Sequence, residues 1–536
     1  MQKNLIILVL VYFLSFTTTP PQYQSLPLST SSRWIIDDST SARVKLTCVN
    51  WAAHLEPMLP EGLDRKPLAQ IAKHISTMGF NCVRLTWATY MFTRHANLTV
   101  AQSFQRLGLE DSIEGISNNN PQFLNYSVVE AQRAVIEELG HQDVMVVLDN
   151  QVSQPMWCCS DNDGNGFFGD KYFDANEWLQ GLDIVANRYK DTSMVVAMSM
   201  RNELRGPLQN ESIWYENIQR GATTIHNTNP NLLVIVSGLH YDLDFTFLKE
   251  KPLKLDIIKN KLVYETHRYS FSAGQTQLWL TQPFDKVCQS ITQEIHTKAG
   301  FLTALAPLFV SEFGINQVEV NRAESLFLDC FLGYLAEMDL DWSVWALQGS
   351  YYLRDGLHGP EETYGMLDSN WSSIRNTEFH HKLQLIHQQI QDPDSNGSSY
   401  YILYHPSSGR CVNVENSEVH ATDCWSFSRW KHEAGNRNPI RLMDSELCLS
   451  ASGDGTPVTL STDCTKEQSQ WELLSNSKFQ LANKDENGTY SCLEWDPNYS
   501  SIIQTNKCMC LEDADSINCT QGNPQTQWFK LVLANV

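Results

Sequence analysis

Two glutamates close apolar segments of this chain, and their positions predict paired carboxylate chemistry. Glu203 follows Asn202 at the end of the run Val195–Glu203, and Glu312 lies in the run Leu308–Gly314. A carboxylate at the end of an apolar strand is costly to bury unless it is paired or used in chemistry. Each glutamate alone fits a structural ion pair as well as catalysis. Together in one cleft they fit hydrolysis of a glycosidic bond, with one as nucleophile and the other as acid and then base.

The elements that must position these glutamates alternate between two patterns. Eight apolar, β-rich runs recur, as expected of strands buried on both faces. The runs are Lys45–Trp51, Asn81–Trp87, Val144–Asn150, Val195–Glu203, Leu232–Gly238, Leu262–Tyr269, Leu308–Gly314 and Asp341–Gly349. Apolar residues three and four apart predict helices between them, at Pro67–Met78, Val128–Leu139, Trp178–Tyr189, Ile213–Asn227, Cys288–Ala299 and Ala323–Met338. Eight such alternations predict an α/β fold, a (β/α)8 TIM barrel within residues 25–391.

Polar or aromatic side chains close most of the runs. They are Asn50, Trp51, Arg84, Trp87, Asp149, Asn150, Asn202, Glu203, His267, Tyr269, Glu312, Trp345 and Gln348. The carboxyl ends of barrel strands form the active-site face, so these groups are expected around one cleft. The fourth and seventh strands lie across the barrel mouth, which is why Glu203 and Glu312 are expected to face each other.

The segment Gln151–Tyr172 is one of the two longest loops expected at that face. Its stretch Asp161–Asp170 is rich in Asp, Asn and Gly, so a calcium site is one reading. The spacing fits no EF-hand, and a turn-rich rim loop is the favoured interpretation. His380 and His381 are adjacent rather than helically spaced, which is typical of a surface pair. We predict neither a metal nor a cofactor.

A different pattern begins after the stretch 392–399, whose sequence DPDSNGSS is that of a linker. In residues 400–536, a unit with one cysteine pair followed by a Trp recurs three times. Three copies of a strand-rich unit predict an all-β β-trefoil, in which each pair staples one lobe and each Trp fills the shared core. The pairs are Cys411 with Cys424, Cys448 with Cys464 and Cys492 with Cys508, followed by Trp430, Trp471 and Trp528. Cys510 and Cys519 remain as a further pair in the third lobe.

The composition restricts the partners of this chain. Its 536 residues carry a formal net charge of −22 at pH 7. An acidic surface repels the phosphate backbone, so we expect no nucleic-acid partner. The 19 Tyr and 15 Trp suit stacking on sugar rings as well as ordinary packing.

Residues 1–24 have the pattern of a secretory signal peptide. Lys3 precedes an apolar run from Leu5 to Phe16, which is short for a membrane span, and no later stretch is long and apolar enough for one. An uncleaved anchor is the alternative. The 14 cysteines and eight sequons favour a glycosylated, oxidised protein that is secreted. The sequons begin at Asn97, Asn125, Asn210, Asn370, Asn396, Asn487, Asn498 and Asn518.

On these residues, the barrel segment resembles glycoside hydrolase family 5, the cellulase-like retaining enzymes. An Asn-Glu pair ends the fourth strand in that family and carries the acid/base, as Asn202-Glu203 does here, and the nucleophile ends the seventh, as Glu312 does. Four further positions match: Arg84, His267, Tyr269 and Trp345.

The resemblance implies a role for each matched residue. Arg84 would keep Glu312 ionised, and Tyr269 would donate a hydrogen bond to it. Asn202 would bind the sugar 2-hydroxyl. His267 would bind substrate or tune Glu203, and Trp345 would offer a flat face to a pyranose ring.

One position departs from the family. Many members carry a His near the end of the third strand, where this chain has Asp149-Asn150-Gln151, and we expect Asn150 to replace it in substrate binding. The adjacent pair Cys158-Cys159 and the run Asp161–Asp170 resemble plant members, for which the extracellular location would be the cell wall or apoplast.

Residues 400–536 resemble a ricin B-type lectin. Sugar-binding lobes of that family carry an Asp two residues after the first Cys, where this chain has Asn413, Ser450 and Glu494. The Gln of the usual Gln-x-Trp is replaced by Ser428, Ser469 and Thr526. The fold is therefore expected to be kept while galactose-type sites are eroded.

We predict a secreted retaining glycoside hydrolase that cleaves O-glycosidic bonds by double displacement. The expected partner is a β-linked polysaccharide or glycoside, such as a glucan or mannan. Two alternatives stay open: a carbohydrate-binding, lectin-like protein whose barrel is weakly active or inactive, and a transglycosidase that uses the same residues.

Overall fold

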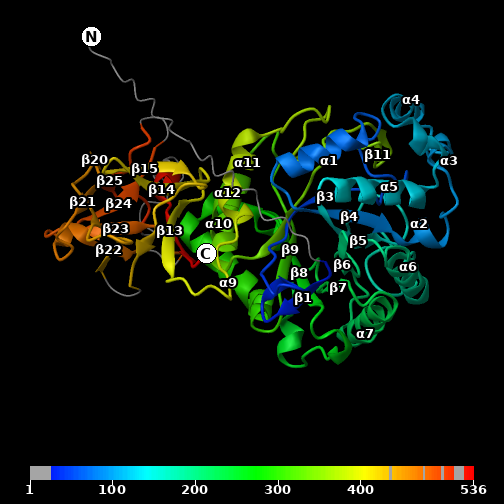
Figure 1. Ribbon diagram of the computed structural model, residues 1–536, viewed down its shortest axis with the longest axis horizontal. Helices are drawn as coiled ribbons and strands as arrows, with labels where there is room; N and C mark the ends of the chain where they lie inside the picture. The colour runs from blue at the N-terminus through cyan, green and yellow to red at the C-terminus, as the bar shows by residue number, and fades with distance from the viewer. Residues whose placement is uncertain (1–25, 434–436, 475–476, 497–499, 512–523) are drawn as a thin grey trace, which may run out of the picture.

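Eight parallel strands close into a barrel in the order that the apolar runs predict (Figure 1). The structure, a computed structural model, describes residues 26–433, 437–474, 477–496, 500–511 and 524–536. The barrel strands are β3 (Thr47–Trp51), β4 (Cys82–Ala88), β5 (Met145–Val152), β6 (Val195–Ser199), β7 (Leu233–Val236), β8 (Leu262–Arg268), β9 (Leu308–Phe313) and β10 (Asp341–Val344). Strand β10 pairs with β3 and closes the ring. The predicted TIM barrel is therefore confirmed.

Helices follow most of these strands and cover the outside of the barrel. They are α1 (Leu68–Thr77), α2 (Thr89–Thr93), α3 (Val100–Gln105), α4 (Glu110–Asn119), α5 (Val128–His141), α6 (Ala175–Arg188), α7 (Glu211–Thr228), α8 (Thr276–Thr281), α9 (Phe284–Lys298), α10 (Arg322–Met338), α11 (Thr377–Lys382) and α12 (Gln384–His387). Between β7 and β8 the fully described chain forms the 3-10 turns Thr246–Lys249 and Asp256–Ile258 instead of an α-helix. Within the described ranges, no helix combines the length and the apolar character needed to cross a bilayer.

Helix α5 shows how the local sequence sets these boundaries. The Ser127 hydroxyl accepts the backbone N–H of Glu130 at 3.3 Å, and the Glu130 carboxylate accepts the backbone N–H of Ser127 at 2.9 Å. This capping box satisfies two amides at the start of the helix. Val135 and Leu139 recur four apart on the buried face, so the helix packs against the barrel along one stripe.

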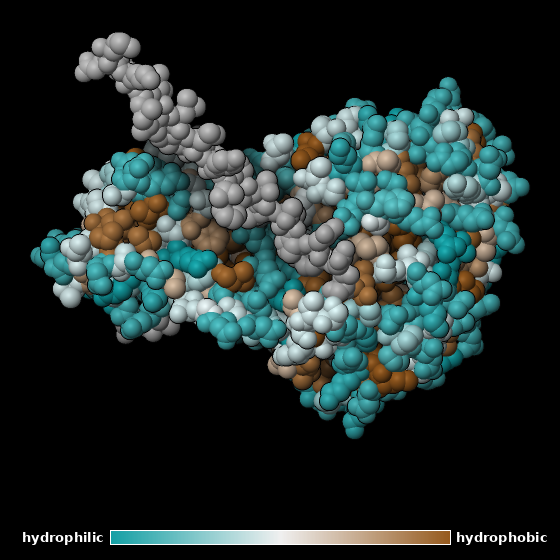
Figure 2. Space-filling model, viewed as in Figure 1, coloured by the Kyte–Doolittle hydropathy of each residue, from teal (hydrophilic) through white to brown (hydrophobic). Residues whose placement is uncertain are grey.

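The two ends of the barrel differ in chemistry. The hairpin of β1 (Leu28–Ser31) and β2 (Trp34–Asp37) covers the amino-terminal end, where Leu28 and Ile35 join an apolar cluster with barrel residues such as Val147. Hydrophilic residues dominate the barrel surface in Figure 2, with apolar residues in small groups. The buried charges near the amino-terminal end, Arg43, Lys45 and Asp339, pair with one another, whereas Arg84 and Glu312 are buried towards the carboxyl ends of the strands.

The described part of residues 400–536, the C-terminal region, forms antiparallel sheets beside α9, α10 and α12 (Figure 1). The strands are β13 (Tyr400–His405), β14 (Arg410–Glu415), β15 (Glu418–Asp423), β16 (Trp430–Lys431), β17 (Asn438–Pro439), β18 (Arg441–Leu442), β19 (Cys448–Ser450), β20 (Thr456–Pro457), β21 (Thr459–Ser461), β22 (Gln470–Leu473), β23 (Leu481–Lys484), β24 (Tyr490–Glu494), β25 (Gln504–Lys507) and β26 (Lys530–Ala534). A further hairpin, β11 (Leu353–Arg354) with β12 (Leu357–His358), belongs to the loop after β10.

The cysteines of the C-terminal region join as the repeat predicts. The disulfides are Cys411–Cys424, Cys448–Cys464 and Cys492–Cys508. Cys519 lies outside the described residues, so its pairing with Cys510 stays a prediction. Three further disulfides lie in the barrel: Cys48–Cys82, Cys288–Cys330 and Cys158–Cys159.

The prediction that all three repeat Trp residues fill the C-terminal core is wrong for one of them. Trp430 and Trp471 are fully buried in that core. Trp528 instead stacks on Phe284 of α9, with ring centroids 3.4 Å apart. Its neighbour Phe529 enters the C-terminal core. Successive residues of an extended chain point to opposite sides, so only one of the two can face that core.

Candidate active site

A cavity of about 560 Å³ opens at the carboxyl ends of the barrel strands. Its lining includes Glu203, His267, Tyr269, Glu312 and Trp345. The sequence predicts each of these five residues for the site, and they come from four different strands or strand ends. The barrel therefore brings distant groups together: Glu203 and Trp345 are 142 positions apart in the chain.

Glu312 lies near the end of β9 and is held by two donors. Arg84 Nη1 donates to its Oε1 at 2.8 Å, and the Tyr269 hydroxyl donates to its Oε2 at 3.0 Å. Burial favours the neutral acid, but the charges of His267 and Arg84 and these hydrogen bonds outweigh it and lower the pKa of Glu312. Burial and the neighbouring Glu312 raise the pKa of Tyr269 well above its ordinary value, so the phenol stays protonated as a donor. Glu312 is therefore an ionised, oriented carboxylate.

Glu203 lies beyond the end of its strand rather than within it. Strand β6 ends at Ser199, and the backbone at Glu203 has a φ of 46°, in the left-handed region that costs a non-glycine residue free energy. Two contacts hold this turn: the Glu203 N–H donates to Asp242 Oδ2 at 2.9 Å, and Arg205 Nη1 donates to the Glu203 carbonyl at 2.7 Å. The turn directs the Glu203 carboxylate into the cavity.

His267 links the two glutamates. Its Nδ1 lies 2.9 Å from Glu203 Oε1 and 3.7 Å from Glu312 Oε2. Its Nε2 lies 3.0 Å from Ser311 Oγ and 3.7 Å from Asp242 Oδ2. Burial alone would lower the pKa of His267, but Glu312, Glu203 and Asp242 raise it to about 10. The imidazole is therefore a cation between the carboxylates at neutral pH.

Arg84 is the fully buried cation below Glu312. Its Nη2 lies 2.8 Å from Asp149 Oδ1 and 3.6 Å from Glu265 Oε2, and it donates to Asn202 Oδ1 at 2.9 Å. One guanidinium thus lies close to the carboxylates of Asp149, Glu265 and Glu312. Burial lowers the pKa of Arg84, but these three charges outweigh it and raise that pKa above its ordinary value.

Asp149, Glu265 and Asp242 are buried carboxylates of the site. The sequence analysis expected Asp149 at the cleft without giving it a role, and it did not identify Glu265 or Asp242. Burial raises the pKa of Asp149 to about 7 against the opposing charge of Arg84. Glu265 accepts a hydrogen bond from Ser199. A signal was present for Glu265, because it interrupts the apolar run that ends in His267 and a charge there needs a partner.

The structure corrects the prediction for Asn150. Its fully buried amide donates to Thr89 Oγ1 at 3.1 Å and accepts from Arg201 Nη1 at 3.1 Å, and it does not line the cavity. The next residue, Gln151, lines the cavity instead. The pairing of β4 with β5 shifts between Asn150 and Val152, so Gln151 is an extra residue in the strand, and such a bulge changes which side chain faces the site.

His54 is a second lining residue that the sequence analysis missed. Its Nδ1 lies 2.8 Å from Thr86 Oγ1, and its buried Nε2 has no hydrogen-bond partner among the described residues. Burial and the charge of Arg84 lower the pKa of His54 to about 3, so the ring is neutral. It follows β3, outside the residues that close the apolar runs, which is why the pattern did not indicate it.

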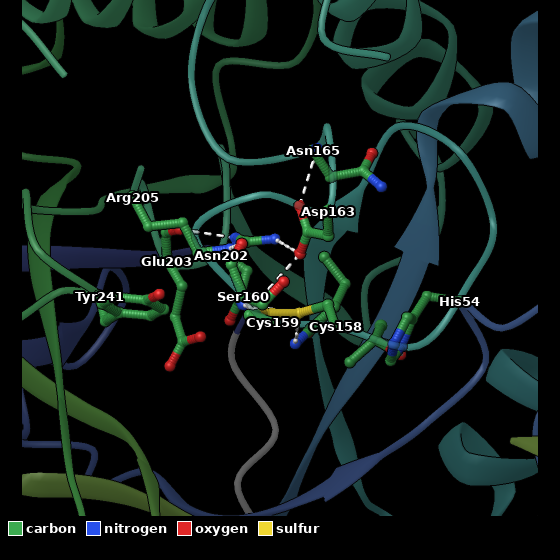
Figure 3. Close-up of a disulfide and its surroundings, with 12 residues drawn as sticks. His54, Cys158, Cys159, Ser160, Asp163, Asn165, Asn202, Glu203, Arg205 and Tyr241 are labelled. Carbon is green, nitrogen blue, oxygen red and sulfur yellow. Dashed lines mark hydrogen bonds and ion pairs between the residues drawn. A yellow bond between two sulfur atoms is a disulfide. The ribbon is translucent and has the colours of Figure 1, made fainter. Parts of the chain in front are cut away.

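In the rim loop Asp161–Asp170, the carboxylate of Asp163 is held by protein groups. Arg205 Nη2 lies 2.5 Å from Asp163 Oδ2, and the backbone N–H of Asn165 donates to Asp163 Oδ1 at 2.8 Å (Figure 3). These contacts lower the pKa of Asp163 against burial. Since both carboxylate oxygens of Asp163 have protein partners, the interpretation of this segment as a turn-rich loop fits the structure better than the interpretation as a calcium site.

Two clusters among the described residues have the geometry to surround a metal ion, and both include Glu203. One adds Cys158 and Cys159, whose sulfurs are joined in a disulfide and are not thiolate ligands. The other adds His267 and Glu312, and a metal ion there would have to displace the proton in the contact of His267 Nδ1 with Glu203 Oε1 at 2.9 Å. The donor set therefore suits proton transfer better than metal binding.

Comparison with known proteins gives this arrangement a family context. The model for cellulase (glycosyl hydrolase family 5) matches residues 45–350. A glycosyl hydrolase 5 family protein of Chamaecyparis obtusa is 45% identical over 529 residues, which cover 95% of this chain and 94% of the relative. An endoglucanase of Paenibacillus polymyxa is 21% identical over 368 residues, 64% of this chain and 83% of that protein.

Solved structures share the barrel fold. The catalytic domain of the major endoglucanase from Xanthomonas campestris pv. campestris has a TM-score of 0.56 at 20% identity, covering 67% of this chain and 99% of that one. A cellotetraose complex of an endocellulase from Pyrococcus horikoshii has a TM-score of 0.54 at 16% identity, covering 68% and 99%. At these identities the likeness is one of fold.

Proposed function

Since this chain belongs to glycosyl hydrolase family 5 and is a cellulase-like glycosidase, we propose that it hydrolyses a β-linked glucan with retention of anomeric configuration. The observation that carries retention is the separation of the two glutamates. One carboxylate oxygen of Glu203 and one of Glu312 lie within 4.8 Å of each other. Retaining enzymes hold their carboxyls about 5–5.5 Å apart, whereas inverting enzymes leave about 6.5–9.5 Å for a water molecule.

In the first step, Glu312 attacks the anomeric carbon while Glu203 gives its proton to the departing glycosidic oxygen. The bond from the anomeric carbon to that oxygen breaks, and a glycosyl ester with Glu312 forms. The lowered pKa of Glu312 supports its assignment as the nucleophile, since only the ionised carboxylate can attack.

In the second step, Glu203 removes a proton from water, and the hydroxide displaces Glu312 from the anomeric carbon. Two displacements restore the original configuration. His267 touches Glu203 and lies near Glu312, so its positive charge stabilises the carboxylate that is ionised at each stage. An acceptor sugar in place of water would give transglycosylation by the same route.

The substrate class rests on the relatives and on the lining of the cavity. The matched proteins are named endoglucanases and endocellulases, and one solved relative is a cellotetraose complex. Trp345 and Tyr269 line the cavity, and aromatic faces pack on the C–H faces of pyranose rings. We therefore propose β-glucan oligosaccharides as substrates.

The stereochemical course tests the proposal. We expect cellotetraose, monitored by proton NMR during the first minutes of hydrolysis, to release the β-anomer before mutarotation produces the α-anomer. Initial release of the α-anomer would contradict retention. Absence of turnover on cellotetraose, mannan oligosaccharides and aryl β-glycosides would contradict the hydrolase assignment, and binding without turnover would favour the lectin-like alternative.

Tyr269→Phe should move the acidic limb of the kcat/KM profile to higher pH. Glu312 acts as the carboxylate, so activity falls as pH drops through its pKa, and loss of the Tyr269 hydrogen bond raises that pKa. A hydrogen bond to a charged group is worth about 1.5–3 kcal/mol, which corresponds to a shift of about one to two pH units. Tyr189→Phe, which removes a buried hydroxyl bonded to Gln132, is the matched control and should leave the profile unchanged. Coincident acidic limbs for Tyr269→Phe and the parent would contradict the role of Tyr269.

We also propose that residues 400–536 are a β-trefoil and that the protein is secreted. The three cysteine pairs, each within one repeat, and the buried Trp430 and Trp471 support the trefoil. The six described disulfides support an oxidising compartment. The segment 1–24, read as the signal peptide, lies outside the described residues.

A further inference from the structure

A disulfide between neighbouring residues forms part of the wall of the catalytic cavity. Cys158 and Cys159 are joined to each other on the loop after β5, and both line the cavity. Figure 3 shows the bond between the side chains of Glu203 and His54. Both sulfurs and one Glu203 carboxylate oxygen lie within 4.8 Å of one another. The disulfide is thus next to the atoms that would meet the scissile bond.

Stabilisation of the fold does not explain this bond. The other five described disulfides join residues 13 to 42 positions apart, whereas this one joins residues one position apart. In the chain-entropy account, a disulfide stabilises a fold by closing a loop in the unfolded chain, and the effect grows with loop length. A link between adjacent residues closes almost no loop, so its function depends on where it places the two sulfurs.

A sugar ring has apolar C–H faces and polar hydroxyls at its edge. The disulfide and the side chains around it offer an apolar surface and a hydrogen-bonding amide. The Asn202 amide nitrogen lies 3.6 Å from Cys159 Sγ and 3.8 Å from Cys158 Sγ, and the Gln151 amide nitrogen lies 3.8 Å from Cys158 Sγ. Asn202 is fully buried, does not line the cavity and accepts from Arg84, so the structure does not place it for its predicted contact with a sugar hydroxyl. Gln151 lines the cavity, and because sulfur is a weak acceptor its amide keeps hydrogen-bonding capacity for a hydroxyl. The buried Oε1 of Gln151 has no partner among the described residues. A disulfide itself offers no N–H or O–H donor and is apolar and polarisable.

We propose that the Cys158–Cys159 disulfide is a sugar-contacting surface, on which the C–H face of the pyranose ring at the scissile bond rests. The amide of Gln151, which lines the cavity, binds a hydroxyl at the edge of that ring. The disulfide complements Trp157, which follows Met156 on the same loop and packs 6.4 Å from Trp345 between ring centroids. This inference rests on the proposed function, because it assumes a β-glucan in the cavity.

Protection from reduction tests the contact on the folded protein. The Glu312→Gln protein, which binds substrate without turnover, is treated with a water-soluble phosphine with and without saturating cellotetraose, and alkylated thiols are located by mass spectrometry. We expect cellotetraose to slow reduction of Cys158–Cys159 at least tenfold. The rate for Cys448–Cys464, in the C-terminal region, is the internal control and should not change.

Two double variants separate the apolar surface from the covalent link. Cys158→Ala/Cys159→Ala and Cys158→Ser/Cys159→Ser both remove the bond, in the Glu312→Gln background, but only the serine pair is polar. By calorimetric titration with cellotetraose, we expect about tenfold weaker binding for the alanine pair and a further several-fold loss for the serine pair. Cys448→Ala/Cys464→Ala is the matched control and should bind as the parent does.

The outcomes distinguish this inference from the proposed function. Binding of cellotetraose without protection of the disulfide overturns the inference alone, as do double variants that bind as tightly as the parent. Equal weakening by the alanine and serine pairs would assign the bond a purely structural role and also overturns it. Absence of cellotetraose binding by the parent overturns the proposed function and the inference together.

Discussion

We expect Glu312→Gln to lower kcat on cellotetraose by about 10⁴- to 10⁶-fold, the range seen when a catalytic nucleophile or its partner is removed. The carboxamide has nearly the shape of the carboxylate but is neutral and cannot form a stable glycosyl ester. Arg84 and Tyr269 both donate to Glu312, so the variant also places an amide where two donors require acceptors. Initial rates under saturating substrate measure the loss.

Chemical rescue makes this test specific to a nucleophile. In Glu312→Ala, azide can enter the vacated space and attack the anomeric carbon while Glu203 protonates the leaving group, giving an α-glycosyl azide from a β-glycoside. Glu319→Gln, which removes an exposed carboxylate from the loop after β9, is the matched control and should keep full activity. Glu312→Gln activity above a tenth of the parent's would assign the nucleophile elsewhere.

Arg84→Met should lower the free energy of unfolding by about 3–5 kcal/mol, the cost of leaving buried charges without their partner. The change removes the only guanidinium that the described structure places against Asp149, Glu265 and Glu312 together. Urea unfolding at pH 8 measures the deficit. Arg94→Met, which breaks an ion pair with Glu177 at a half-exposed arginine, is the control and should cost under about 1 kcal/mol.

The pH dependence of that deficit identifies its cause. Without Arg84, the buried carboxyls have higher pKa values in the folded than in the unfolded state, so the folded variant binds more protons. Lower pH then favours the folded variant, and its deficit relative to the parent should shrink between pH 8 and pH 5. A deficit that is constant over this range would mean that lost packing, rather than uncompensated charge, explains the destabilisation.

The barrel and most of its site are predictable because both depend on short-range patterns. Continuous apolar runs identify strands buried on both faces, and the fold then places the end of every run at one rim. Glu203, Glu312, Arg84 and His267 could be expected at the rim on that basis, while the resemblance to the family implied their roles. The pattern does not show which side chains of a strand face the cavity. The bulge at Gln151 places this residue in the cavity lining in place of Asn150.

Other features depend on contacts between distant segments and leave no periodic signal. Asp242 follows β7 in a turn, and only the tertiary structure brings it to the backbone of Glu203. Trp528 has the same place in its repeat as Trp430 and Trp471, yet it packs on Phe284 because the barrel lies beside that lobe. A sequence repeat predicts the contacts that all of its copies make. It does not predict a contact that only one copy makes with another part of the protein.

The packing of Trp528 on Phe284 also fixes the C-terminal region against the barrel. The contact extends through Lys530, whose Nζ lies 2.8 Å from Glu337 of α10. The stretch after the barrel is fixed too, since the N–H of Asp392 donates to Asn535 at 2.7 Å. The C-terminal region is therefore not a module that moves freely on a tether. Any ligand bound to it would be held at one distance and angle from the catalytic cavity.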